Sequence, residues 1–139
     1  MRFSINFVRK YPLSLLLTVA IWVLCLIPVP ETPLSDVTMI DKWTHIAFYL
    51  VLSLTIGVED WRARRVGRLV RLSPQAGVWH HRLLIIFILP ACMGGLIELV
   101  QAYCTNGMRS GEWMDFLADA IGSALGFICI LLAACHAKG

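Results

Sequence analysis

One group of ionisable residues in this sequence has the spacing of a single helical stripe. Asp41, His45 and Tyr49 follow one another at intervals of four residues, and Lys42 lies beside them. Asp41 could orient the imidazole of His45, so that the two act together as a general acid and base. Lys42, with Arg109 from a later loop, could hold a phosphate group. The stripe is therefore the first candidate for a catalytic or ligand-binding site.

Two later segments carry polar residues at the same kind of spacing. Glu98 and Gln101 are three residues apart, and Asp115 and Asp119 are four apart, so each pair shares one face of a helix. Glu98 could act as a second acid or base, while Gln101, Asp115 and Asp119 could contact a ligand. Glu98 could alternatively ligate a metal together with His45 and Asp119. The pattern itself assigns no metal site and identifies no cofactor.

The elements that must position these residues are helices in a membrane. The chain is 58% apolar and only 15% charged, and its charges are separated by long uncharged runs, a distribution typical of lipid-embedded chains. Four runs approach the ~20 residues that a helix needs to cross hydrocarbon, the third with Pro90 as an expected kink. The sequence predicts an all-α membrane protein, a four-transmembrane-helix bundle in one domain over residues 1–139. The expected helices are about 12–29, 41–58, 83–103 and 115–135.

The positive charges predict the orientation of this bundle. Of the twelve Lys and Arg residues, ten fall on one side of four crossings: Arg2, Arg9, Lys10, Arg62, Arg64, Arg65, Arg68, Arg71, Arg82 and Lys138. Only Lys42 and Arg109 fall on the other side. By the positive-inside rule both termini and the basic loop 59–82 are cytoplasmic, in a multi-pass protein of the plasma (inner) membrane. We expect that loop to meet anionic lipid headgroups and not nucleic acid, and we expect His80, His81 and His136 to be solvated.

In this topology the polar residues converge near the outer face. The second and fourth helices begin there and the third ends there, so Glu98 and Asp119 lie at membrane depth. Charged groups at that depth face a bundle interior or a water-filled cleft. Small residues predict a close approach of the third and fourth helices: Gly94, Gly95, Gly122, Ser123 and Gly126.

The order and spacing of these residues resembles the VanZ-like family of small membrane proteins. The similarity covers about residues 41–126, with Asp41-Lys42-x-x-His45-x-x-x-Tyr49, Glu98-x-x-Gln101 and Arg109-x5-Asp115-x3-Asp119-x2-Gly122-x3-Gly126. The family often has Asn where this chain has Asp119. Its named member is associated with resistance to the glycopeptide antibiotic teicoplanin. The resemblance implies a role in the cell envelope but supplies no reaction.

Three interpretations remain open at this point. The cleft could catalyse a reaction on a cell-envelope amphiphile or lipid-linked wall precursor, with His45, Asp41 and Glu98 as the catalytic residues. It could instead bind or transport such a ligand without catalysis. The chain could also be a membrane scaffold or partner-binding protein, its cluster being a structural network that pairs Glu98 with Arg109 and Asp41 with Lys42 or His45. Membrane lipids are the expected partners in each case, and the pattern leaves enzymatic activity and oligomeric state undecided.

Overall fold

The part of the chain that the structure describes is all-α. The structure is a computed structural model that describes residues 8–27, 39–68, 78–104 and 111–136. Its elements are α2 (Pro12–Leu26), α3 (Ile40–Arg68), α4 (Val78–Arg82), the π-helical segment η2 (Leu83–Ile88), α5 (Leu89–Cys104) and α6 (Trp113–His136). The elements α4, η2 and α5 follow one another without a break and form one long helical run.

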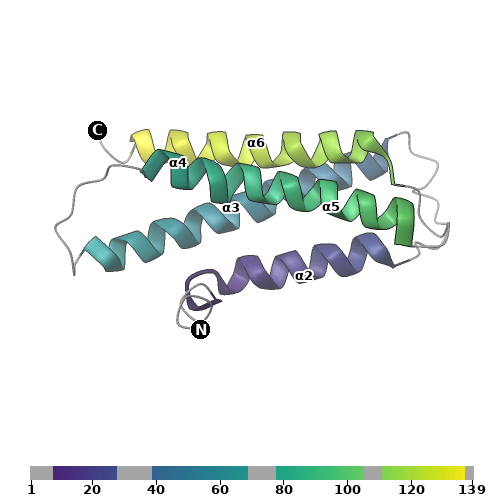
Figure 1. Cartoon of the computed structure of the whole chain (residues 1–139). Coiled ribbons are helices and arrows are strands. Elements are labelled where there is room, and N and C mark those ends of the chain that lie inside the picture. The colour runs from purple at the N-terminus through teal and green to yellow at the C-terminus, as the bar shows by residue number, and fades with distance from the viewer. Residues whose placement is uncertain (1–7, 28–38, 69–77, 105–110, 137–139) are drawn as a thin grey trace.

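The helices lie side by side and alternate in direction (Figure 1). The packing of α3 against α6 is the most extensive, and the α4–η2–α5 run and α2 flank that pair. One end of the bundle is formed by the last turn of α2, the first turn of α3, the last turn of α5 and the first turn of α6; we call it the site end. The opposite end, where α2 and α4 begin and α3 stops, is called the basic end.

Two helical runs are long and apolar enough to cross a membrane. They are Trp79–Cys104, of 26 residues, and Trp113–His136, of 24 residues. The apolar helix α2 has 15 residues, and α3 has 29 residues with charged groups near both of its ends. The described residues therefore contain two candidate membrane spans by length and composition.

The exposed faces of the long helices are apolar, while their interior includes many polar groups. Each of α2, α3, α5 and α6 exposes large apolar side chains, among them Leu16, Val51, Leu99 and Ile128. The buried residues include apolar ones such as Tyr49 and Ile97, and also a polar set: Ser14, His45, Ser53, Glu59, Asp60, Glu98, Gln101, Asp115, Asp119 and Ser123. A soluble protein of this size seldom leaves so much large apolar surface uncovered.

Glycines allow α6 to pack closely against its neighbours. A Cβ atom at Gly122 would lie 2.4 Å from the carbonyl oxygen of Ile46, and one at Gly126 would lie 2.6 Å from Cβ of Ser53. Both of these glycines therefore face α3. The prediction that they bring the third and fourth helices together is wrong, but Gly94 of α5 does face Asp119 of α6.

Two helices differ from their predicted course. The helix α3 continues to Arg68, whereas the sequence analysis began a loop at residue 59. The sequence changes from apolar to charged residues at Glu59, and this change ends the apolar run from which the span was predicted. It does not end the helix, because the first residue of low helix propensity after Asp60 is Gly67. In the α4–η2–α5 run, π-helical residues 83–88 lie just before Pro90. Proline collides with the carbonyl four residues earlier, and the wider π turn accommodates it.

Candidate functional site

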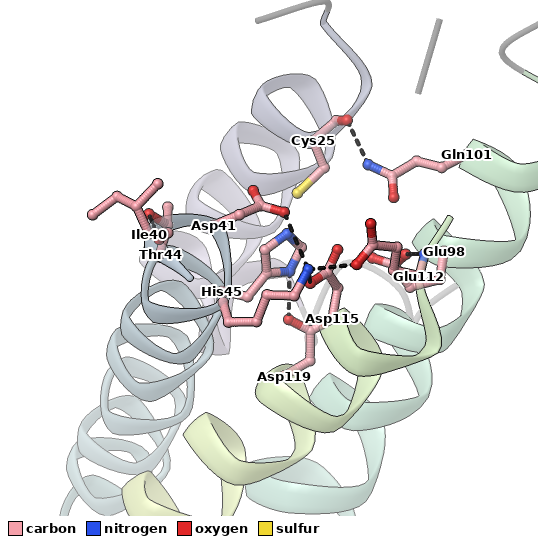
Figure 2. Close-up of polar contacts among 11 residues, drawn as sticks. Cys25, Ile40, Asp41, Thr44, His45, Glu98, Gln101, Glu112, Asp115 and Asp119 are labelled. Carbon is pink, nitrogen blue, oxygen red and sulfur yellow. Dashed lines mark hydrogen bonds and ion pairs between the residues drawn. The ribbon is translucent and has the colours of Figure 1, made fainter. Parts of the chain in front are cut away.

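The centre of the site end is a buried pair between α3 and α6. Nδ1 of His45 lies 2.8 Å from Oδ1 of Asp119, within hydrogen-bond distance, and both residues are buried (Figure 2). The sequence analysis had given the role of orienting His45 to Asp41. That assignment is corrected, because Asp41 pairs with Lys42 at 3.9 Å and its side chain is about half exposed. The glycine at position 94 leaves the space that the Asp119 carboxylate occupies.

Lys42 is surrounded by carboxylates. Its Nζ lies 2.6 Å from Oε2 of Glu112, 2.8 Å from Oδ1 of Asp115 and 3.9 Å from Oδ2 of Asp41. The ammonium group is thereby committed to three acidic partners and ties the start of α3 to the start of α6. Arg109, the other residue expected to hold a phosphate or to pair with Glu98, lies outside the described residues.

Glu98 of α5 reaches the same region from the third helix. Its Oε2 accepts a hydrogen bond of 2.8 Å from the backbone N–H of Glu112. Its Oε1 is buried and has no hydrogen-bond partner among the described residues, and the same holds for Oδ2 of Asp119 and the hydroxyl of Tyr49. Among the described residues of the site, these three buried oxygen atoms are available to form a hydrogen bond with a ligand.

Gln101 has a different position from the one expected for a ligand contact. Its Nε2 donates a hydrogen bond of 2.7 Å to the backbone carbonyl of Cys25 (Figure 2). That carbonyl lies in the last turn of α2. Gln101 therefore joins α5 to α2 at the site end.

The charges of the site end are predominantly negative. The described residues place five carboxylates there, against the ammonium of Lys42 and the imidazole of His45: Asp41, Glu98, Glu112, Asp115 and Asp119. Two overlapping triplets each offer one ligand atom per residue within 4.8 Å of one another: Asp41, His45 and Asp115, and His45, Glu98 and Asp119. A cationic or hydrogen-bond-donating group suits such a site better than a phosphate does.

A second polar cluster lies at the basic end, and the sequence analysis missed it. Oε1 of Glu59 accepts from the backbone N–H of Leu13 at 2.8 Å, and Oε2 accepts from both the N–H and the hydroxyl of Ser14. The carboxylate thus satisfies the first free N–H groups of α2. The signal available in the sequence was the position of Pro12, which marks the start of a helix whose N–H groups need acceptors.

Asp60 is completely buried beside Glu59. Nζ of Lys10 lies 3.1 Å from Oδ1, the hydroxyl of Tyr11 donates to the same oxygen at 3.2 Å, and Nε of Arg64 donates to Oδ2 at 2.6 Å. Nε of Arg82 lies 3.7 Å from Oδ2. Burial opposes ionisation, but the hydrogen bond and charge of Arg64, with those of Lys10, hold the pKa of Asp60 below its ordinary value. The cluster joins α2, α3 and α4.

The histidines of the predicted loop and tail differ in their surroundings. Nδ1 of His81 lies 2.9 Å from Nη2 of Arg64 and the ring is partly buried, so the prediction that His81 is solvated is wrong. His80 and His136 are exposed, as expected.

The site end has groups suited to moving a proton. An imidazole held through one nitrogen by a buried carboxylate, as His45 is by Asp119, keeps a fixed orientation and leaves Nε2 for a ligand. Glu98 adds a buried carboxylate oxygen with no donor among the described residues.

Comparison of the chain with protein-family models, with curated proteins and with solved structures finds no match.

Proposed function

We propose that this chain is a four-span plasma-membrane protein of the VanZ-like family, with both termini in the cytoplasm, and that its site end binds or acts on a cell-envelope amphiphile. The observation that carries the proposal is the burial of His45, Glu98 and Asp119, from three helices, at one end of a bundle with apolar outer faces. A lipid-linked wall precursor is the ligand class that matches this position, because its headgroup lies at the membrane surface. A link to glycopeptide resistance follows from the same family proposal.

Two observations support four spans. The exposed apolar side chains lie on α2 and α3 as well as on the two candidate spans, so all four helices offer a face suited to lipid. Lys10, Arg64 and Arg82 gather at the basic end, whereas Lys42 is the described cation among the carboxylates of the site end. The positive-inside rule then makes the basic end cytoplasmic and the site end external.

The charge of the site narrows the ligand chemistry. Lys42 is held by three carboxylates, which favours a headgroup that donates hydrogen bonds or carries an amine over one that is bound through its phosphate. Oε1 of Glu98 and the hydroxyl of Tyr49 are the buried acceptors that such a group would meet. Leaving a buried acceptor without a donor costs about 1–3 kcal/mol, so a ligand that supplies one gains in affinity.

A structural role is the second candidate. Lys42 joins α3 to α6 through carboxylates, and Gln101 joins α5 to α2 through the carbonyl of Cys25. A scaffold protein needs nothing beyond such links. Under this alternative, replacing His45 or Glu98 lowers the stability of the protein, and any loss of activity follows from the loss of folded protein.

Two measurements test the proposal. Reporter fusions at residues 67 and 107 should report opposite sides of the membrane, with residue 67 in the cytoplasm; a shared compartment for both would refute the four-span topology. Mass spectrometry of the chain purified from native membranes in mild detergent should detect a co-purified envelope amphiphile.

The variants decide between the two candidate functions. His45→Gln and Glu98→Gln should fold as the parent does and lose the bound amphiphile, while Glu112→Gln, whose side chain is about half exposed, should retain it. Loss of folding in the first two variants would favour the scaffold role. Unchanged amphiphile binding in both would show that these residues do not form its site.

A further inference from the structure

We propose that His45, Glu98 and Asp119 form a binding site for one divalent transition-metal ion of the zinc or manganese type. The inference deepens the proposed function. It rests on that function in one respect, which is that the ion enters the site from the outer face of the membrane. Each residue comes from a different helix, α3, α5 and α6 respectively, and all three are buried.

The geometry of the three residues suits one ion. One ligand atom from each lies within 4.8 Å of the others. Ligands bound at about 2.1 Å to a common ion lie roughly 3–4 Å apart, and small side-chain rotations close that difference. One imidazole nitrogen and two carboxylate oxygens, without a thiolate, form a donor set that zinc and manganese accept. Magnesium prefers oxygen ligands with several waters and would bind this set more weakly.

The second observation is the state of the carboxylates. Glu98 is 7% exposed and Asp119 is 0% exposed, and each has one oxygen with no hydrogen-bond partner among the described residues. Lys42, the cation of the site end in the described part of the chain, contacts Glu112, Asp115 and Asp41 instead. Two buried carboxylates therefore face the region between α3, α5 and α6, and among the described residues neither contacts a Lys or Arg side chain, while Asp119 contacts the imidazole of His45. A dication supplies two charges at that position.

The contact between His45 and Asp119 can be replaced by the ion. Nδ1 and Oδ1 are 2.8 Å apart, which is a hydrogen-bond distance and is also close to the ~3.0 Å separation of two neighbouring ligands on one ion. A metal bound to Nδ1 takes the place of the proton between the two atoms, and the single proton of a neutral imidazole then lies on Nε2. Three protein ligands also leave coordination positions open, as in metal sites that accept a water or a substrate group.

The test is a titration of the purified full chain in detergent. After a chelator has removed metals, Zn²⁺ and Mn²⁺ are titrated separately by calorimetry. The proposal expects saturation at one ion per chain. It also expects Mg²⁺ at the same concentrations to give a much weaker signal. Absence of saturable binding by the folded parent chain overturns the proposal.

Variants locate the site. His45→Ala and Glu98→Gln should each lower the affinity by about 100-fold or more, since loss of a group that merely supports a ligand already costs 10–100-fold. The control Glu112→Gln removes a neighbouring carboxylate outside the triplet and should leave the affinity unchanged. Equal affinities in all three variants would refute the assignment. Far-UV circular dichroism without metal identifies a variant that does not fold. If His45→Ala or Glu98→Gln does not fold, Asp119→Asn is used in its place, and the visible spectrum of bound Co²⁺ is compared with that of the parent chain. An unchanged spectrum would refute the site.

The two proposals fail separately. Metal binding by a chain that carries no amphiphile leaves the metal site standing and refutes the amphiphile. Amphiphile binding by a chain that takes up no metal refutes the metal site and leaves the proposed amphiphile binding standing.

Discussion

Gly94 determines where the Asp119 carboxylate can lie, and replacing it by alanine gives a quantitative test of the site geometry. A methyl group at position 94 would lie 2.3 Å from Oδ2 of Asp119, 2.8 Å from its Cβ and 2.9 Å from its Cγ. These distances are too short for any non-bonded contact. Gly94→Ala therefore forces the carboxylate to rotate away from His45 or forces α5 to move away from α6.

Each of these two adjustments has a known range of cost. Rotation breaks the contact between Asp119 and His45, and a hydrogen bond that involves a charged group contributes about 1.5–3 kcal/mol. Separation of the helices is an overpacking effect, which costs about 1–3 kcal/mol. Because the protein needs only the less costly of the two adjustments, we expect Gly94→Ala to lower the free energy of unfolding by about 1–3 kcal/mol and not by the sum.

The matched control is Gly95→Ala. A methyl group there would meet the ring of Phe116 at 3.2 and 3.3 Å, and this ring is partly exposed and can turn. Unfolding of both variants is measured by far-UV circular dichroism in mixed micelles of dodecyl maltoside and dodecyl sulfate. In an Asp119→Ala background, Gly94→Ala should cost less, because two of the three close atoms are gone; coupling energies between contacting residues are about 0.5–3 kcal/mol. Equal costs for the two glycine variants, or no coupling to Asp119, would refute the reasoning.

Three further predictions concern the rest of the bundle. Glu59→Gln should lower the free energy of unfolding by about 1.5–3 kcal/mol, because an amide cannot accept all the hydrogen bonds that the carboxylate takes from the start of α2; faster amide hydrogen exchange at Ser14 would locate the loss, and unchanged exchange would contradict it. Since the pKa of Asp60 is held below its ordinary value, its stabilising effect is complete above about pH 4, the pKa in an unfolded chain, and is lost as the pH falls further. The stability difference between the parent and Asp60→Asn should therefore narrow below pH 4, and a difference that stays constant there would exclude this linkage. Gly122→Ala should cost about 3 kcal/mol or more, because its methyl group would meet the backbone of Ile46 at 2.4 Å and backbone cannot rotate away; the yield of folded protein in membranes measures this, and a normal yield would contradict it.

The helical character of the chain and the grouping of its polar residues were accessible from sequence. Apolar run lengths predict helices, and Pro12 does begin α2. Spacing of three and four residues places His45 and Glu98 on definite faces of their helices. Antiparallel neighbours with short connections then bring those faces to one end. The all-α fold was therefore predictable, whereas four membrane spans stay a prediction.

The pairing within the group was not accessible. Whether Asp41 or Asp119 meets His45 depends on the rotation of α3 and α6 about their own axes. That rotation is set by the close approach of Gly122 and Gly126 to α3, which spacing along one helix does not reveal. The burial of Asp60 was missed for a related reason, because its partner Lys10 is fifty residues away along the chain.

The π-helical segment Leu83–Ile88 changes the direction in which the side chains of the following helix α5 point. Each π turn holds about one residue more than an α turn, and one residue corresponds to about 100° of rotation around the axis. Everything after Ile88 is thus turned relative to the half that precedes it. Glu98 faces the bundle interior in this phase, whereas an uninterrupted α-helix would direct it toward a different sector. The rotation of the Glu98-bearing half about the helix axis is therefore set by a few uncharged apolar residues that lie more than one turn away from Glu98.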